Sequence, residues 1–368
     1  MKELIRKVKK TFFALKEKGI WFTYNLWWLS TFYSYSDNFF RNLFYLKIYP
    51  LFKRFPYPSS IEIEASTKCN LRCIMCEHTY WNEASRDMSF EQVKSIIDQF
   101  PVLRWIAFTG IGENFLNKDL MKMYEYLTKK WPGIHIELFD TFYFIDEEKA
   151  KKILDLGLGT IFISIDAATK ETYEKVRASS DFNRVVGNIK RFIELKNERK
   201  AYFPEIIFHY VINKINLSEV FTFIDFVKSL GGRTIFFTRL LHSFKEVNDL
   251  VVDVSPDLSR QVHEKAKKAG IYITWNGDIC INKTPVSHCN AWITPFVYVS
   301  GDVVPCCAMN EANIRDFQKQ NSLGNVFQQS FKEIWEGEKF SNFRKEIRTG
   351  RVPLLCRDCP MFDVAAKK

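Results

Sequence analysis

Between residues 60 and 245, short apolar runs alternate with stretches of helical periodicity, and this alternation restricts the fold more than any other feature. The runs are rich in β-branched and aromatic residues, which favour strands. They span residues 61–65, 105–109, 134–139, 160–165, 205–211 and 234–238. Helical patterns lie near residues 90–99, 119–130, 147–155, 184–197 and 217–230. Strands separated by helices pair in parallel, which predicts a binding face at their carboxyl ends.

Six strand–helix units are too few for a closed eight-stranded barrel. The sequence therefore predicts an α/β fold whose centre is a partial (β/α)6 TIM-type barrel, over residues 59–245. An N-terminal basic, aromatic-rich helical segment precedes it, over residues 1–58. After residue 245 the alternation fades, and a small α+β extension with cysteine ligands is expected over residues 246–368.

The first sixty residues hold eleven basic and three acidic residues, and thus most of the net charge of +10. Apolar residues at helical spacing lie among lysines, as in a basic amphipathic helix: Ile5, Val8, Phe12 and Leu15. Polar residues interrupt the uncharged stretch 20–36, so a membrane-spanning helix is not expected. Its aromatic residues suit a membrane–water interface, but also packing against the barrel or a partner subunit.

The start of the chain lacks the unbroken apolar run and the cleavage site of a secretory signal. We therefore expect a cytoplasmic protein. If the aromatic residues of segment 1–58 do meet a membrane, the contact would be peripheral and on its inner face.

Three cysteines follow the first predicted strand in one loop, at the spacing C-x3-C-x2-C: Cys69, Cys73 and Cys76. Thiolates are soft ligands that select iron–sulfur clusters or zinc, and three of them can hold three corners of a 4Fe–4S cluster. The fourth iron then has no protein ligand. A small molecule with amino and carboxylate groups can chelate it, receive an electron and be cleaved. A zinc site is the alternative.

This loop resembles the signature of the radical S-adenosylmethionine (SAM) superfamily, including the bulky Met75 before the last cysteine. The resemblance implies a SAM-binding 4Fe–4S cluster, SAM itself and a reducing partner such as flavodoxin or ferredoxin. It also implies a reaction in which SAM is cleaved to a 5′-deoxyadenosyl radical that abstracts hydrogen from a substrate C–H bond.

The stretch after the second predicted strand, residues 109–114, resembles the Gly-Gly-Glu-Pro turn of this superfamily. The resemblance implies that Gly112 and Glu113 meet the methionine amino group of SAM. Asn114 replaces the usual proline, which predicts a less rigid turn. After the third predicted strand, where relatives have Thr-Asn-Gly, the chain reads Asp140-Thr141-Phe142, so no contact with ribose or substrate is inferred from that loop.

The stretch after the fourth predicted strand resembles the superfamily pattern Ser-x-Asp followed by Tyr-Glu-x-x-Arg. The matching residues with implied roles at SAM are Ser164, Asp166 and Arg177. Ser164 would contact the ribose or the carboxylate of SAM. Arg177 would neutralise that carboxylate, a pairing that guanidinium geometry favours.

A second group of cysteines resembles the SPASM or twitch extension behind many radical SAM barrels: Cys289, Cys306, Cys356 and Cys359. The resemblance implies one auxiliary 4Fe–4S cluster with no iron open to substrate, which would serve electron transfer or structural support. The family spacing favours Cys306 over Cys307 as the ligand. A structural zinc is the alternative, since zinc ribbons also use four cysteines with a terminal C-x2-C.

The remaining thiols Cys280 and Cys307 are candidate hydrogen-atom donors for a substrate radical, although buried cysteines are also common core residues. The resemblance thus implies a radical SAM enzyme of oxidoreductase or isomerase type. Dehydrogenation, epimerisation and cross-linking all stay open.

The basic, aromatic segment 1–58 suggests an amphiphilic substrate such as a lipid-linked sugar or glycolipid. The alternative is a SPASM enzyme that modifies a small molecule, a ribosomal peptide or another protein. A zinc-binding, nucleic-acid-binding protein is a remote alternative. It is disfavoured because the barrel region is nearly neutral, so no nucleic-acid partner is expected.

Overall fold

The computed structural model describes residues 2–32, 39, 43–48, 51, 55–240, 244–275, 289, 291–307 and 314–359. Ten of the described strands form one sheet in the order β12-β11-β10-β1-β3-β4-β5-β7-β8-β9, and two more pair separately. Six of them are the predicted strands: β1 Ser60–Ile63, β3 Trp105–Phe108, β4 His135–Asp140, β5 Thr160–Ser164, β7 Glu205–Ile212 and β8 Thr234–Arg239. Each pairs in parallel with its neighbour, which confirms the α/β partial barrel.

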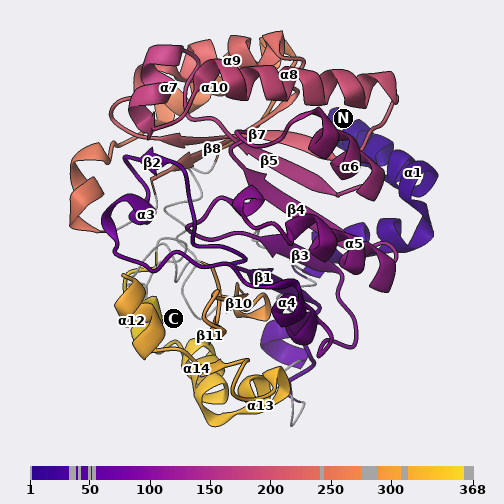
Figure 1. Ribbon diagram of the computed structural model, residues 1–368, viewed down its shortest axis with the longest axis vertical. Helices are drawn as coiled ribbons and strands as arrows, with labels where there is room; N and C mark the ends of the chain where they lie inside the picture. The colour runs from indigo at the N-terminus through magenta and orange to yellow at the C-terminus, as the bar shows by residue number, and fades with distance from the viewer. Residues whose placement is uncertain are drawn as a thin grey trace.

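Helices on the outer side of the curved sheet connect these strands (Figure 1). They are α4 Phe90–Ile97, α5 Leu120–Lys130, α6 Glu147–Leu156, α7 Lys170–Val176, α8 Phe182–Glu198 and α9 Val220–Ser229. Local sequence fixes their ends. A capping box between Ser89 and Gln92 starts α4, and left-handed Gly157 ends α6.

Strand side chains alternate between two environments. On β5 and β7, Ile161, Ile163 and Phe208 are fully buried in the core shared with the outer helices. The intervening side chains, such as Phe162 and His209, are only half-buried. The outer face of the barrel is therefore its hydrophobic core, and the inner face stays partly accessible.

The sheet extends beyond the six predicted strands on both sides. α10 (Pro256–Ala269) and β9 (Tyr272–Trp275) add one more unit, parallel to β8. On the other side β10 (Phe296–Val297) pairs in parallel with β1, and β11 (Asp302–Val304) and β12 (Gly324–Asn325) follow antiparallel. The predicted C-terminal extension thus continues the sheet of the barrel.

Helices complete this C-terminal region at the bottom of Figure 1: α12 Arg315–Gln320, α13 Phe331–Glu336 and α14 Glu338–Thr349. Short helical turns lie elsewhere: η1 Leu43–Ile48, η3 Asn114–Leu116, η4 Leu217–Glu219, η5 Lys245–Leu250, η7 Ala291–Ile293 and η8 Leu354–Cys356. None of the described helices has the length and apolar character needed to cross a membrane.

Helix α1 (Lys2–Phe32) lies against the amino ends of the strands, beside α6 in Figure 1. It bends at Gly19, whose φ of 79° lies in the left-handed region that glycine tolerates. Phe22 is buried on its inner face and contacts the rings of His135, which begins β4, and of Phe203, two residues before β7. The predicted amphipathic helix therefore covers the end of the barrel away from the predicted SAM-binding motifs.

Candidate functional site

The predicted cluster cysteines Cys69, Cys73 and Cys76 lie in one loop that begins just beyond the carboxyl end of β1. Within it, β2 (Arg72–Cys73) pairs antiparallel with β6 (Arg177–Ala178). Helix α3 (Glu77–Tyr80) follows directly. The short ribbon fastens the cysteine loop to the segment that carries Arg177, and so brings two predicted motifs together.

Burial raises the pKa of the Cys69 thiol to about 12, and Cys73 and Glu113 add to this rise. Burial also raises the pKa of Cys76, where the charges of Glu77, Cys73 and Cys69 act in the same direction. The thiols thus lie close enough to influence one another. Thiols that resist ionisation alone become thiolates when a metal binds, so this donor set fits an iron–sulfur cluster.

Gly112 lies where the predicted SAM-binding turn crosses the cysteine loop. A Cβ atom there would lie 2.1 Å from the carbonyl oxygen of Ser66, so only glycine fits. The backbone N–H of Glu113 donates to the carbonyl of Lys68 at 2.7 Å. The turn and the cysteine loop therefore form one packed unit, although they are far apart in sequence.

The side chain of Glu113 is buried beside the loop that follows β4. Thr141 Oγ1 donates to Glu113 Oε2 at 2.8 Å. Burial, and after it the charge of Glu113, raises the pKa of Asp140 well above its ordinary value of 3.8. Phe142 has a φ of 63°, at the position where relatives have glycine. The loop that departs from the family pattern thus supports the predicted SAM-contacting glutamate.

Asn114, which stands in place of the usual proline, is also buried. Its side-chain amide donates to the carbonyl oxygens of Phe108 and Phe139, both at 3.0 Å. These two hydrogen bonds tie the turn to the ends of β3 and β4, so the side chain supplies the restraint that the missing proline ring does not.

Asp166 and Arg177 form a buried salt bridge, with Nη2 and Oδ2 2.5 Å apart. Asp166 also accepts the backbone N–H of Val211, and Arg177 Nη1 lies 3.9 Å from Cys73 Sγ. Burial lowers the pKa of Arg177, but Asp166, Cys73 and Tyr173 together raise it above its ordinary value. Arg177 therefore stays charged beside the cysteine loop. Ser164, at the end of β5, lies half-buried in register with His209.

Aromatic rings line the inner face of the barrel below these motifs. The rings of Phe139 and Phe162 stack with centroids 4.4 Å apart, and those of His209 and Phe236 stack at 5.2 Å. His209 Nε2 lies 2.9 Å from Thr238 Oγ1. Burial lowers the pKa of His209 to about 4, so the wall is uncharged at neutral pH. In the sequence, the aromatic residues at the inward-facing positions of the strands were a signal for this wall that the sequence analysis did not use.

The four predicted auxiliary ligands also come together. Burial raises the pKa of Cys356, and the thiols of Cys306, Cys289 and Cys359 add to this rise. Cys307 is half-buried next to Cys306. Within the described part of the chain, no group of three or more His, Cys, Asp or Glu side chains is placed so that it could hold a single metal ion. Cys280, the other predicted hydrogen donor, lies outside the described residues.

A buried ion pair that the sequence did not reveal links the two cysteine regions. Arg315 Nη2, on α12, lies 2.7 Å from Glu64 Oε1, next to β1. The same carboxylate accepts the N–H groups of Ile111 and Val299, each at 3.3 Å. Glu64 thus joins the predicted SAM-binding turn to the C-terminal region. The partners are 251 residues apart, so local sequence patterns carry no signal for the pair.

Models of known protein families match both cysteine regions of the chain. The family model of the radical SAM superfamily matches residues 63–227, and that of the SPASM iron–sulfur cluster-binding domain matches residues 289–360. The chain is 27% identical over 323 residues to the tungsten-containing aldehyde ferredoxin oxidoreductase cofactor-modifying protein of Pyrococcus furiosus, covering 82% of this chain and 87% of that one. It is 26% identical over 341 residues to the AdoMet-dependent heme synthase of Methanosarcina barkeri, covering 84% and 90%.

Solved structures show the same fold at lower sequence identity. Streptococcus suis SuiB bound to S-adenosylmethionine has a TM-score of 0.62 and 14% identity, over 81% of this chain and 70% of that chain. The protein anSMEcpe with bound AdoMet has a TM-score of 0.59 and 22% identity, over 82% and 85%.

Proposed function

This chain is a radical SAM enzyme with a C-terminal SPASM domain, and from that premise we propose that it oxidises a C–H bond of a substrate held inside the barrel. The observation that carries the proposal is the packing of the cysteine loop against the Gly112 turn and Arg177, at one end of the sheet. This end carries the chemistry in enzymes with parallel barrels.

The thiols of Cys69, Cys73 and Cys76 would hold the SAM-binding 4Fe–4S cluster. When bound and reduced, this cluster supplies the electron that cleaves SAM to methionine and the 5′-deoxyadenosyl radical. The Gly112 turn and Glu113 would hold the methionine amino group, and Ser164 the ribose or carboxylate. Arg177, kept charged by Asp166, would lie near enough to the loop to balance the carboxylate of SAM.

The auxiliary 4Fe–4S cluster would be bound by Cys289, Cys306, Cys356 and Cys359. An electron acceptor with a full set of protein ligands suits dehydrogenation or cross-linking, because the substrate radical must lose one electron and one proton. Epimerisation would instead need a thiol such as Cys307 or Cys280 to return a hydrogen atom. A flavodoxin or ferredoxin would supply the electron for SAM cleavage.

The uncharged aromatic wall of Phe139, Phe162, His209 and Phe236 favours a substrate with a flat apolar part. The names of the two sequence relatives, one a cofactor-modifying protein and one a heme synthase, support a small cofactor-like molecule. A peptide is the second candidate, because SuiB is also known bound to the precursor peptide SuiA. Helix α1 covers the opposite end of the barrel, so it lends no support to the lipid-linked sugar expected from the sequence.

Anaerobic reconstitution with iron and sulfide tests the proposal. The reduced enzyme should convert SAM to 5′-deoxyadenosine, and Cys76→Ala should not. A cofactor precursor, a precursor peptide and a lipid-linked sugar, each deuterated, would then compete as substrates. Deuterium in 5′-deoxyadenosine identifies the substrate that loses hydrogen. No 5′-deoxyadenosine from the reconstituted enzyme contradicts the proposed function.

A further inference from the structure

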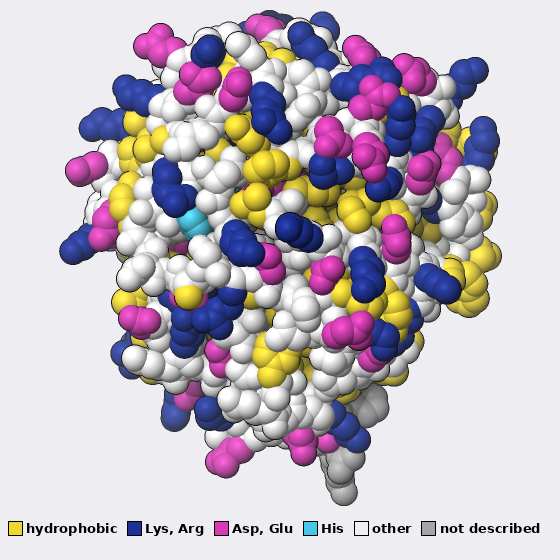
Figure 2. Space-filling model, in the orientation of Figure 1, with side chains coloured by type: hydrophobic (Ala, Val, Ile, Leu, Met, Phe, Trp, Pro, Cys, Tyr) yellow, Lys and Arg dark blue, Asp and Glu magenta, His cyan; other side chains and the backbone are white. Residues whose placement is uncertain are grey.

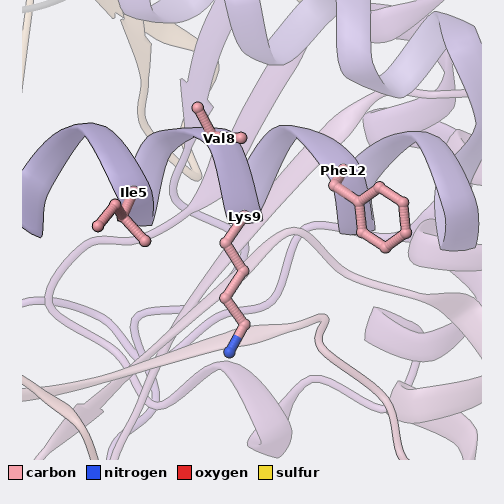
Figure 3. Close-up of a pocket in the computed structure, with 4 residues that line it drawn as sticks. All are labelled: Ile5, Val8, Lys9 and Phe12. Carbon is pink, nitrogen blue, oxygen red and sulfur yellow. The ribbon is translucent and has the colours of Figure 1, made fainter.

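We propose that the outer face of α1 binds the surface of an anionic lipid bilayer. Its apolar side chains stand out into solvent: Ile5 is 59% exposed, Val8 61% and Phe12 59%. They follow one another at intervals of three and four residues, so they form one stripe along the helix. Figure 3 shows them with Lys9 around a shallow pocket on α1. Figure 2 shows hydrophobic side chains along the same edge of the molecule, where Figure 1 draws α1.

The inner face of α1 is fastened to the barrel, so the stripe cannot turn inward. Glu17 accepts the backbone N–H groups of Tyr202 and Phe203, at 2.9 to 3.1 Å. Asn25 donates to the carbonyl of Gly133 at 2.8 Å. An ion pair joins Lys10 to Glu205. With the inner side occupied, the exposed apolar stripe is a stable feature of the folded chain and has no partner within its described part.

Lysine side chains border the apolar stripe, and their positive charge favours an anionic lipid surface as its binding partner. Lys9 and Lys16 follow Ile5 and Phe12 by four residues, which places them alongside the stripe. Lys7 is exposed on the same helix. The acidic Glu17 is turned toward the barrel, where its carboxylate accepts the backbone N–H of Tyr202. A second copy of this helix would bring lysines against lysines. An anionic bilayer accepts the apolar side chains and the lysine ammonium groups together.

Two tryptophans in the part of α1 beyond the bend at Gly19 are also exposed. Trp21 is 66% and Trp27 55% exposed, whereas Phe22 of the same helix is 2% exposed. Indole rings favour the headgroup region of a bilayer. This inference deepens the peripheral membrane contact expected from the sequence by naming its surface. It does not depend on the radical chemistry.

Vesicle flotation of the reconstituted full-length protein tests the inference. The probes are vesicles of phosphatidylcholine alone and of phosphatidylcholine mixed with phosphatidylglycerol. The protein should float with the mixed vesicles only. Reversing the charges by Lys7→Glu, Lys9→Glu and Lys16→Glu should weaken binding roughly a hundredfold, since each lysine near an anionic surface contributes about fivefold.

A matched variant reverses three exposed lysines on α9 and α10, namely Lys228, Lys267 and Lys268. It changes the net charge equally and should lose much less binding. A second pair separates apolar contact from charge. Ile5→Gln/Val8→Gln/Phe12→Gln should lose binding, whereas Val102→Gln/Val251→Gln, also at exposed apolar positions, should not.

Equal flotation of both lysine variants, or unchanged flotation of the α1 glutamine variant, would overturn the inference. So would sedimentation showing that this glutamine variant turns a dimer into a monomer while vesicle binding persists, because the stripe would then bind a second copy. All variants should still form 5′-deoxyadenosine at the wild-type rate. A wild-type protein that binds vesicles but forms none would refute the proposed function alone.

Discussion

Gly112 shows how one missing side chain sets the distance between two parts of the site. Without a Cβ atom, the turn that carries Glu113 reaches the backbone of Ser66 and Lys68. Glu113, the residue proposed to hold the methionine amino group of SAM, is therefore tied to the loop of the predicted cluster ligands. Substitutions at such a contact should change the geometry of the site more than the stability of the fold.

We expect Gly112→Ala to lower SAM cleavage by about tenfold or more, since a displacement of about 1 Å can cost a hundredfold. The reference is Gly187→Ala on α8, where an added Cβ meets nothing within 4 Å. The measurements are 5′-deoxyadenosine formation and the change that SAM produces in the electron paramagnetic resonance of the reduced cluster. Similar values for the two variants would contradict the predicted contact.

The neighbours Cys306 and Cys307 allow the auxiliary ligand to be identified. Cys306→Ala should lose about half of the iron and sulfide per chain, because one of two clusters would lack a ligand. Cys307→Ala should keep both. Iron and sulfide analysis of anaerobically purified protein distinguishes them. Loss of iron in the second variant alone would assign the ligand to Cys307.

The buried pair of Arg315 and Glu64 should matter for stability. Arg315→Met leaves a buried carboxylate without its guanidinium, which costs about 3–5 kcal/mol of unfolding free energy. Arg260→Met removes only exposed pairs and should cost less than about 1 kcal/mol. Urea denaturation followed by circular dichroism measures both. If the pair acts as described, adding Glu64→Gln to Arg315→Met should restore part of the loss.

At the scale of elements, α1 combines two unlike faces. The side chain of Phe22 is 2% exposed and that of its neighbour Trp21 is 66% exposed. Phe22→Ala should therefore lower the free energy of unfolding by about 3–5 kcal/mol. Trp21→Ala should change it by less than about 0.5 kcal/mol. Thermal denaturation compares them, and equal destabilisation would mean that both faces of α1 are packed.

Most elements of the barrel could be predicted because strands and helices have different apolar periods, as in residues 160–165 and 184–197. The cysteine loop was visible from its spacing alone. β9 was missed because the α10–β9 unit is separated from β8 by residues 240–255, where the alternation of strands and helices fades. β10–β12 contain only two or three residues each, too few for a period to show. Contacts such as His209 with Thr238 depend on pairing between strands, which sequence does not specify locally.

At the scale of the whole molecule, one sheet joins the barrel to the SPASM region. The backbone N–H of Glu64 donates to Val297 at 2.8 Å, and Ser60–Ile63 lies between β3 and β10. Strand β1 is thus an interior strand only when the C-terminal region is present. The two cysteine regions should therefore unfold together and depend on each other for solubility.

A chain that ends at Trp275 should aggregate, because β1 would become an uncovered edge with unpaired backbone groups. Cys356→Ser/Cys359→Ser keeps the sheet and removes only predicted ligands, so it should remain monodisperse. Size-exclusion chromatography with light scattering compares the two. A soluble, monodisperse truncated chain would show that the barrel does not need the C-terminal strands.

The position of α1 at the amino ends of the strands also determines from which side the reactants would reach the site. If its outer stripe rests on lipid, the rim with the cysteine loop faces water. Cosubstrate, electron donor and the molecule to be modified would then arrive by diffusion from the aqueous side. Attachment would decide where in the cell the reaction happens, and the choice of substrate would be left to the side chains within the barrel.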